Sequence, residues 1–210
     1  MTQVTIDTTN VFHKAYKSST RITCLQGGTR SSKTYSLCQL FIVKALRETG
    51  KVFTICRKTL PALKGTAYRD IINLLKELDL YREENHNKSE LSYVLGNNNL
   101  LEFISIDQSQ KIRGRKRNYL WLNEANEFNY EDYQQLILRT TEQIYLDYNP
   151  SDPYSWIYDK VITRDDCTFI KSTYKANPFL DKDTIAEIER LKDLDPDYWR
   201  VYGMGEIGSI

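Results

Sequence analysis

Apolar and polar residues alternate along the chain with two different periods. Seven short apolar runs have the length and composition of β-strands, and other segments carry apolar residues every three or four positions, as on one face of a helix. The predicted strands are residues 22–25, 51–56, 91–95, 100–106, 119–122, 143–147 and 168–171. The predicted helices are residues 35–46, 66–78, 130–138, 185–191 and 198–202.

The order of these elements predicts an α/β fold. Apolar strands that alternate with helices imply a mainly parallel β-sheet with flanking helices on both faces. The sequence Gly-Asn-Asn-Asn between residues 91–95 and 100–106 predicts an antiparallel hairpin extension of that sheet. Further along, the pattern changes to one strand and two short helices. We expect a core of residues 1–165 and a small C-terminal lid or linker subdomain of residues 166–210.

A glycine-bearing turn links the first predicted strand to the first predicted helix. The turn contains a Lys-Thr pair, and this strand–turn–helix context is typical of a phosphate-binding loop. Backbone N–H groups at a helix N-terminus point at one spot, and the helix dipole favours negative charge there. The predicted phosphate-binding residues are Gly27, Gly28, Thr29, Arg30, Ser31, Ser32, Lys33 and Thr34.

Two residues of this loop have specific predicted roles. The Lys33 ammonium would reach the β- and γ-phosphates of a nucleotide, and the Thr34 hydroxyl would join the Mg²⁺ shell. Ser32 departs from the common pattern, which has a second glycine at that position. An ordinary Gly/Ser turn that caps a helix is the alternative. The loop favours a P-loop NTPase fold of the ASCE-like type.

The apolar strand 119–122 ends in two polar residues, Asn123 and Glu124. Nucleotide hydrolysis needs an acid at the tip of a strand beside the phosphate loop, to organise Mg²⁺ and polarise the attacking water. We predict that Glu124 is the general base and that Asn123 touches the metal shell through a water. An aspartate is expected where Asn123 stands, and the loss of its charge should weaken Mg²⁺ organisation. A buried strand with a polar end is the alternative.

The strand 143–147 is stopped by an Asn-Pro pair. If this strand lies beside the one that ends in Glu124, the side-chain amide of Asn149 would lie near the γ-phosphate as a sensor. A plain strand-terminating turn explains the pair equally well.

A run of basic residues precedes the strand that ends in Glu124. Its candidate functional side chains are Arg113, Arg115, Lys116 and Arg117. They would contact the DNA backbone, or one of them would be offered to the nucleotide of a neighbouring subunit. We favour DNA contact for Arg115 to Arg117 and the second role for Arg113. A solvated loop is the alternative.

Composition narrows the class of protein further. The formal net charge is +1, so contact with nucleic acid must come from a local patch. The four cysteines form no Cys-x-x-Cys pair, which argues against a metal site and a disulfide framework and favours reduced thiols. No apolar run approaches membrane-spanning length. We expect a cytoplasmic protein without a membrane partner.

Taken together, these motifs resemble the ATPase half of bacteriophage terminase large subunits, the motors that package DNA into empty capsids. The resemblance rests on the loop 27–34 and on Trp-Leu-Asn-Glu-Ala-Asn-Glu at 121–127. Shorter matches are Arg-Lys-Thr at 57–59, Ile-Arg-Gly at 112–114, Asp-Tyr-Asn-Pro-Ser at 147–151 and Tyr-Gly-Met-Gly-Glu-Ile-Gly at 202–208.

The resemblance implies roles for individual residues and for the whole chain. Lys33 and Thr34 would bind phosphate and Mg²⁺, Arg30 would lie near the γ-phosphate, and Glu124 would be the catalytic carboxylate. Asn149 would belong to a motif that couples hydrolysis to movement. The implied activity is ATP hydrolysis that translocates double-stranded DNA into procapsids, in the host cytoplasm, with the terminase small subunit and the portal protein as partners and a ring homo-oligomer on the portal.

The family continues into a nuclease domain of RNase H-like fold, and nuclease activity is not expected in these 210 residues. A helicase-like or other nucleic-acid-dependent ATPase is the alternative enzyme, and a nucleotide-binding scaffold without significant hydrolysis is the alternative outside enzymes. Phe12 and Tyr16 are considered as rings that stack on the base of the nucleotide.

Overall fold

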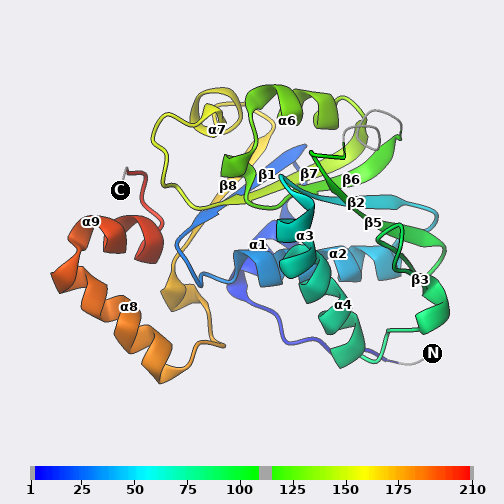
Figure 1. Ribbon diagram of the computed structural model, residues 1–210, viewed down its shortest axis with the longest axis horizontal. Coiled ribbons are helices and arrows are strands. Elements are labelled where there is room, and N and C mark those ends of the chain that lie inside the picture. Colours follow the sequence, from blue (N-terminus) through cyan, green and yellow to red (C-terminus); the bar gives the residue numbers. More distant parts are fainter. Residues whose placement is uncertain (1–2, 109–114, 209–210) are drawn as a thin grey trace.

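The computed structural model describes residues 3–108 and 115–208 of the chain. Within these residues, eight strands form one sheet between two layers of helices (Figure 1). The strands are β1 (Ile22–Gly27), β2 (Val52–Arg57), β3 (His86–Asn87), β4 (Ser92–Leu95), β5 (Asn99–Ser105), β6 (Arg117–Leu122), β7 (Thr140–Tyr148) and β8 (Cys167–Ser172).

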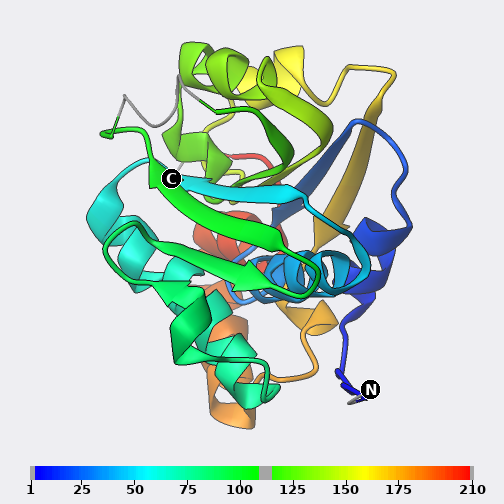
Figure 2. The same cartoon turned by 90° about the vertical axis from the view of Figure 1, so that its right-hand side faces the viewer.

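The sheet is mainly parallel, as the sequence predicts. Its order is β3-β4-β5-β2-β6-β7-β1-β8, and β1, β2, β5, β6, β7 and β8 all run in one direction. The predicted hairpin is also confirmed, because β4 pairs antiparallel with β5 and extends the sheet beyond β2 (Figure 2). β8 is hydrogen-bonded to β1 along its whole length. β8 therefore connects the predicted C-terminal subdomain of residues 166–210 to the sheet of the core.

Helices cover both faces of the sheet (Figure 1). One face carries α1 (Asn10–Lys17), α2 (Lys33–Arg47), α3 (Leu60–Gly65) and α4 (Ala67–Glu77), and the other carries α6 (Tyr130–Ile137) and α7 (Trp156–Lys160). The C-terminal part contains α8 (Lys182–Leu194), α9 (Pro196–Tyr198) and a π-helical turn, η4 (Trp199–Gly203). The 3-10 turns are η1 (Glu83–Asn85), η2 (Ala125–Glu127) and η3 (Tyr174–Ala176). None of the helices in the described ranges is long and apolar enough to cross a membrane.

Several short elements do not appear among the sequence predictions, namely α1, α3, α7 and β3. Helices of about two turns contain too few residues for a clear apolar period. Local side-chain caps stabilise two of them instead, because Thr9 accepts a hydrogen bond from the Phe12 N–H and Ser155 accepts one from the Ile157 N–H.

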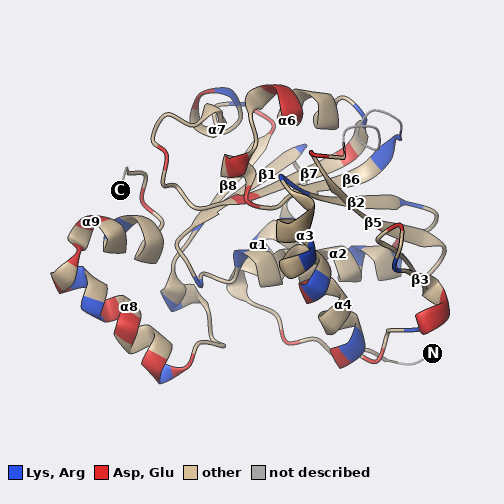
Figure 3. Cartoon of the chain, viewed as in Figure 1, with Lys and Arg blue, Asp and Glu red and all other residues tan. Residues whose placement is uncertain are grey.

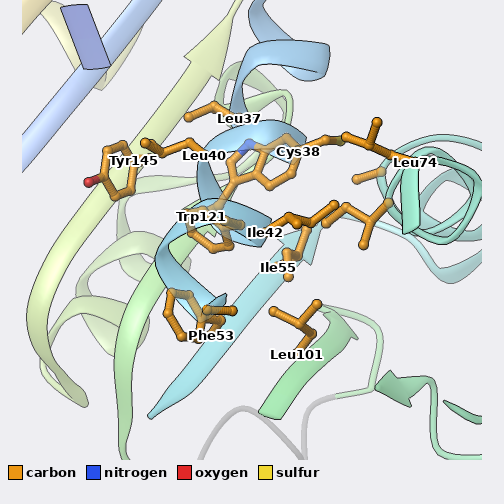
Figure 4. Packing of buried hydrophobic residues seen from close by; sticks show 14 of the residues in the cluster. Leu37, Cys38, Leu40, Ile42, Phe53, Ile55, Leu74, Leu101, Trp121 and Tyr145 are labelled. Carbon is orange, nitrogen blue, oxygen red and sulfur yellow. The ribbon is translucent and has the colours of Figure 1, made fainter. Parts of the chain in front are cut away.

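The helix that follows the phosphate loop lies in the centre of the main core. Leu37, Leu40 and Ile42 of α2 are fully buried, and they pack against side chains of the sheet and of α4 (Figure 4). The ring of Phe41 contacts Phe53, Trp121 and Tyr145 in edge-on geometry, with centroid distances of 5.6–5.7 Å. This packing fixes α2, and with it the phosphate loop, against β2, β6 and β7.

Candidate functional site

The predicted site residues follow neighbouring parallel strands at the same edge of the sheet. The phosphate loop follows β1, Asn123 and Glu124 follow β6, and Asn149 follows β7. Ligands of open α/β sheets bind outside the carboxyl ends of the strands. The edge is hollowed into a cavity of about 320 Å³. Its lining is formed by Thr29, Arg30, Ser31, Ser32, Lys33, Thr34, Tyr35, Asp70, Glu124, Asn149 and Asn177.

The backbone of the loop explains why the common pattern has glycine where this chain has Ser32. Ser32 has φ +70° and Arg30 has φ +63°, both in the left-handed region that glycine adopts without strain. Ser32 is buried, and α2 begins at the next residue. The loop therefore has the backbone conformation for which glycine is preferred, and Ser32 adopts it less favourably than glycine would.

Lys33 ties the loop to the end of β7. Its side chain is buried, and the ammonium donates hydrogen bonds to the carbonyl oxygens of Gly27 and Gly28, both at 2.9 Å. It also donates to the Ser31 hydroxyl and to Oδ1 of Asn149, both at 3.1 Å. Burial lowers the pKa of the Lys33 ammonium, and the carboxylates of Asp147 and Glu124 act in the opposite direction.

Asp147, which the sequence reasoning did not single out, does not line the cavity but is hydrogen-bonded to the turn that carries Asn123 and Glu124. It is fully buried near the end of β7, and its carboxylate accepts hydrogen bonds from the indole N–H of Trp121 and from the backbone N–H of Glu124. The side-chain amide of Asn123 donates to it at 3.1 Å. Burial raises the pKa of Asp147, and these donors oppose the rise. The feature of the sequence that could have pointed to Asp147 is its position two residues before Asn149.

Glu124 is held in a left-handed turn at the cavity wall. Its backbone has φ +52°, and η2 begins at the following residue. Burial and the neighbouring Asp147 carboxylate raise the pKa of Glu124 to about 7, while Lys33 and Arg57 act to lower it. A carboxyl group with a pKa near neutrality is suited to accept a proton from an attacking water.

Asn123 does not line the cavity. Its side chain is 1% exposed and donates to Asp147, and its Oδ1 lies 3.4 Å from the Thr66 hydroxyl oxygen. The Thr66 hydroxyl donates its hydrogen bond to the carbonyl oxygen of Ala62 at 2.6 Å. Thr66 in turn accepts one from the Arg57 guanidinium at 2.7 Å, and Arg57 forms an ion pair with Glu127. The short Arg-Lys-Thr motif after β2 therefore contributes Arg57 to a chain of contacts that ends at Asp147.

The C-terminal segment packs against the back of the phosphate loop. The backbone N–H of Thr29 donates to the carbonyl oxygen of Tyr202 at 2.5 Å. A Cβ atom on Gly28 would lie 2.1 Å from the same carbonyl oxygen, so only glycine fits there. Gln26 donates to the carbonyl oxygen of Gly205 at 2.9 Å. Backbone carbonyl groups of the glycine-rich motif at 202–208 therefore hold the phosphate loop in place by hydrogen bonds.

The basic run divides into parts with different environments. Arg113 lies outside the described residues. Arg115 and Lys116 are exposed directly before β6, whose basic N-terminal end lies far from α8 (Figure 3). Arg115 forms an ion pair with Glu102 at 3.5 Å.

Arg117 corrects the prediction of DNA contact at that position. It is the first residue of β6 and is 1% exposed, with its guanidinium donating to the Thr54 hydroxyl and to the carbonyl oxygen of Leu136, both at 3.2 Å. A β-bulge between Arg117 and Tyr119 shifts the strand register. Arg117 therefore points into the protein and stabilises the packing of α6 on the sheet.

The fold and the loop geometry define a P-loop α/β protein, and comparison with known proteins gives the family. A model of the family described as phage terminase large subunit matches residues 19–206. The chain belongs to this family. The terminase large subunit of the PBSX phage of Bacillus subtilis (strain 168) is 24% identical over 211 residues, which cover 88% of this chain and 48% of that protein.

Solved structures agree on the fold. The large terminase of a thermophilic bacteriophage superposes with a TM-score of 0.81 at 17% identity, covering 96% of this chain and 54% of the other. The ATPase domain of the Thermus phage P74-26 large terminase gives a TM-score of 0.74 at 12% identity, covering 96% and 94%. The chain thus spans about half the length of the full-length relatives and nearly all of a terminase ATPase domain.

The raised pKa of Glu124 predicts a pH dependence of stability. Between the ordinary value of 4.5 and about 7, the folded state binds the proton more tightly than the unfolded state, so the free energy of unfolding should fall as pH rises through this window. Glu124→Gln cannot ionise. Its stability relative to wild type should therefore increase between pH 5 and pH 8, by up to about 3 kcal/mol.

Urea unfolding at the two pH values measures this difference. Glu127→Gln is the matched control, because its carboxylate is partly exposed and paired with Arg57. A Glu124→Gln variant whose relative stability is the same at both pH values would show that the carboxyl group is not held in the environment described.

Proposed function

We propose that this chain binds ATP with Mg²⁺ in the cavity at the phosphate loop and hydrolyses it. The proposal rests on one observation, that Lys33, Thr34 and Glu124 line the same cavity. They supply a positive charge for the phosphates, a hydroxyl ligand for Mg²⁺ and a carboxylate base for the attacking water. Another structure of the thermophilic bacteriophage's large terminase, with a TM-score of 0.80 to this chain, is of a complex with ADP. That likeness supports nucleotide binding here.

Lys33 and Arg30 meet the charge of the nucleotide. The Lys33 ammonium exchanges its hydrogen bonds to the loop carbonyls for the β- and γ-phosphate oxygens, and backbone N–H groups at the start of α2 bind the remaining oxygens. Arg30 is exposed at the rim of the cavity and is available to the γ-phosphate. Positive charge at these positions stabilises the charge that develops in the transition state.

Glu124 orients the attacking water and accepts its proton. Asp147 holds the Glu124 backbone by a hydrogen bond and raises its pKa, and Asn123 acts by positioning Asp147. Asn149, whose Oδ1 contacts Lys33, detects whether the lysine is engaged by phosphate. Making or breaking this contact would couple the presence of the γ-phosphate to the position of the residues that follow β7.

Hard oxygen donors at the cavity fit Mg²⁺, since the Thr34 hydroxyl and the Glu124 carboxylate both line it. These two residues would hold Mg²⁺, which would supply positive charge against the phosphates. Asn123 would reach the metal shell only through a water, because its amide contacts Asp147 and Thr66.

Family membership supports a larger role for the hydrolysis. We propose that it drives double-stranded DNA into procapsids in the host cytoplasm, with the chain acting in a ring of copies on the portal protein and with the terminase small subunit as a partner. The exposed Arg115 and Lys116 are the described residues of the basic run that can reach DNA phosphates. Arg113 stays the proposed residue for the nucleotide of a neighbouring subunit.

Two substitutions test the hydrolysis. Lys33→Ala should abolish ATP binding or hydrolysis, because it removes the buried positive charge of the loop. Glu124→Gln should keep the affinity for ATP and lower the rate of phosphate release by about 100-fold or more, because the amide preserves shape and removes the base. Calorimetric ATP titration and a phosphate-release assay measure the two effects.

Glu127→Gln is the matched control and should hydrolyse ATP at nearly the wild-type rate. If it loses activity while Glu124→Gln does not, the assignment of the base is wrong. Tight ATP binding without phosphate release by the wild-type chain, under conditions where copies associate, would favour the nucleotide-binding scaffold.

The salt dependence of DNA binding tests the role of the exposed basic residues. Replacing Arg115 and Lys116 with alanine should weaken binding equally for all sequences and lower the log–log salt slope by up to about 1.8, since each phosphate contact contributes about 0.9. The same charge change at Lys182 and Arg190 of α8 is the control. An unchanged slope for Arg115 and Lys116, measured by fluorescence anisotropy, would leave these residues as a solvated surface.

A further inference from the structure

The base of the nucleotide needs a surface that the phosphate loop does not provide. Among the described residues that line the cavity, Tyr35 has the only aromatic ring, and the others are polar or charged. Phe12 and Tyr16, which the sequence suggested as rings that stack on the base, lie elsewhere. They stack on each other in α1, and Tyr16 contacts Arg47 at the C-terminal end of α2. The ring of Tyr16 thus lies at the end of α2 remote from the phosphate loop, with Phe12 stacked on it, so neither ring is placed to stack on the base.

A second ring lies next to Tyr35 on the loop that follows β8. Phe179 is 54% exposed, and its ring contacts that of Tyr35 edge-on, with centroids 5.5 Å apart and an interplanar angle of 69°. The edge-on contact and the exposure of Phe179 leave an aromatic face beside Tyr35 open to a ligand. Tyr35 immediately follows Thr34, so this pair lies within one nucleotide length of the phosphate site.

The fold holds the Phe179 loop at the cavity. β8 pairs with β1, so their carboxyl ends, and the loops that follow them, are neighbours. Asn177 donates from its amide to the carbonyl oxygen of Arg30 at 2.9 Å, and its Oδ1 accepts the backbone N–H of Phe179 at 3.0 Å. One side chain therefore fixes the loop both to the phosphate loop and to the residue that carries the exposed ring.

We propose that Phe179 and Tyr35 form the platform on which the nucleobase stacks. This inference rests on the proposed function, since it assigns the base subsite of the same nucleotide. One N–H and the Oδ1 of the Asn177 side chain are engaged with backbone atoms, and aromatic stacking accepts any base. The platform therefore holds the base without reading its edge, and ATP and GTP should bind with affinities within about fivefold of each other.

A pair of ligands separates the base from the phosphates. Phe179→Ala should weaken ATP binding by about 10-fold, in the range found for loss of base stacking, and should leave inorganic tripolyphosphate binding within about twofold of wild type. Phe179→Trp should retain ATP affinity. Phe179→Leu keeps apolar bulk but lacks an aromatic face, so it should resemble alanine. Phe169→Ala removes another exposed phenylalanine, from β8, and is the matched control.

Calorimetry on the folded variants gives each affinity. Unchanged ATP binding in both Phe179→Ala and Phe179→Leu would overturn the platform, and so would an equal loss for ATP and tripolyphosphate, which would indicate a distorted phosphate loop. Lys33→Ala tests the phosphate site separately from the base platform. If it binds tripolyphosphate as tightly as wild type does, then the phosphate site itself, and not the base platform, is wrong.

Discussion

The buried carboxylate of Asp147 is the constraint on which the site depends. An unpaired charge at this depth would be strongly destabilising, so the structure surrounds it with donors from the end of β6: an indole N–H, a side-chain amide and the backbone N–H of Glu124. These hydrogen bonds fix the turn after β6 in its left-handed conformation and place Glu124 at the cavity wall. The same negative charge raises the pKa of Glu124 and offsets the burial of the Lys33 ammonium.

Some side chains belong both to the hydrophobic core and to the site, so the packing of the core determines where the groups of the site lie. Trp121 presents one part of its ring to Phe41 of α2 and donates its N–H to Asp147. The helix that carries Lys33 and the strand that leads to Glu124 are therefore positioned by the same ring. The C-terminal segment adds a third support, because its carbonyl oxygens accept hydrogen bonds from Thr29 and Gln26 on either side of Gly27 and Gly28.

Much of the fold could be predicted because long elements leave a periodic pattern, as in α2 and the parallel strands. The phosphate loop is recognisable even with Ser32, since the Lys-Thr pair and the strand–helix context remain. The expected exposure of Arg117 is wrong because α6 packs over this position and the strand register shifts beside it, and no residue pattern marks either feature. Asp147 and Phe179 acquire their surroundings only when β7 and β8 take their places beside β6 and β1, which local sequence does not encode.

Single-turnover hydrolysis of ATP by Asp147→Asn tests the central claim most directly. An amide at this position keeps the volume but removes the charge, and it turns one acceptor oxygen into a donor that faces N–H groups. ATP affinity should change by less than about threefold while the hydrolytic rate falls by about 100-fold, because Glu124 loses both its position and its raised pKa. A folded Asp147→Asn variant that binds ATP and hydrolyses it at the wild-type rate would show that the site does not depend on the Asp147 carboxylate.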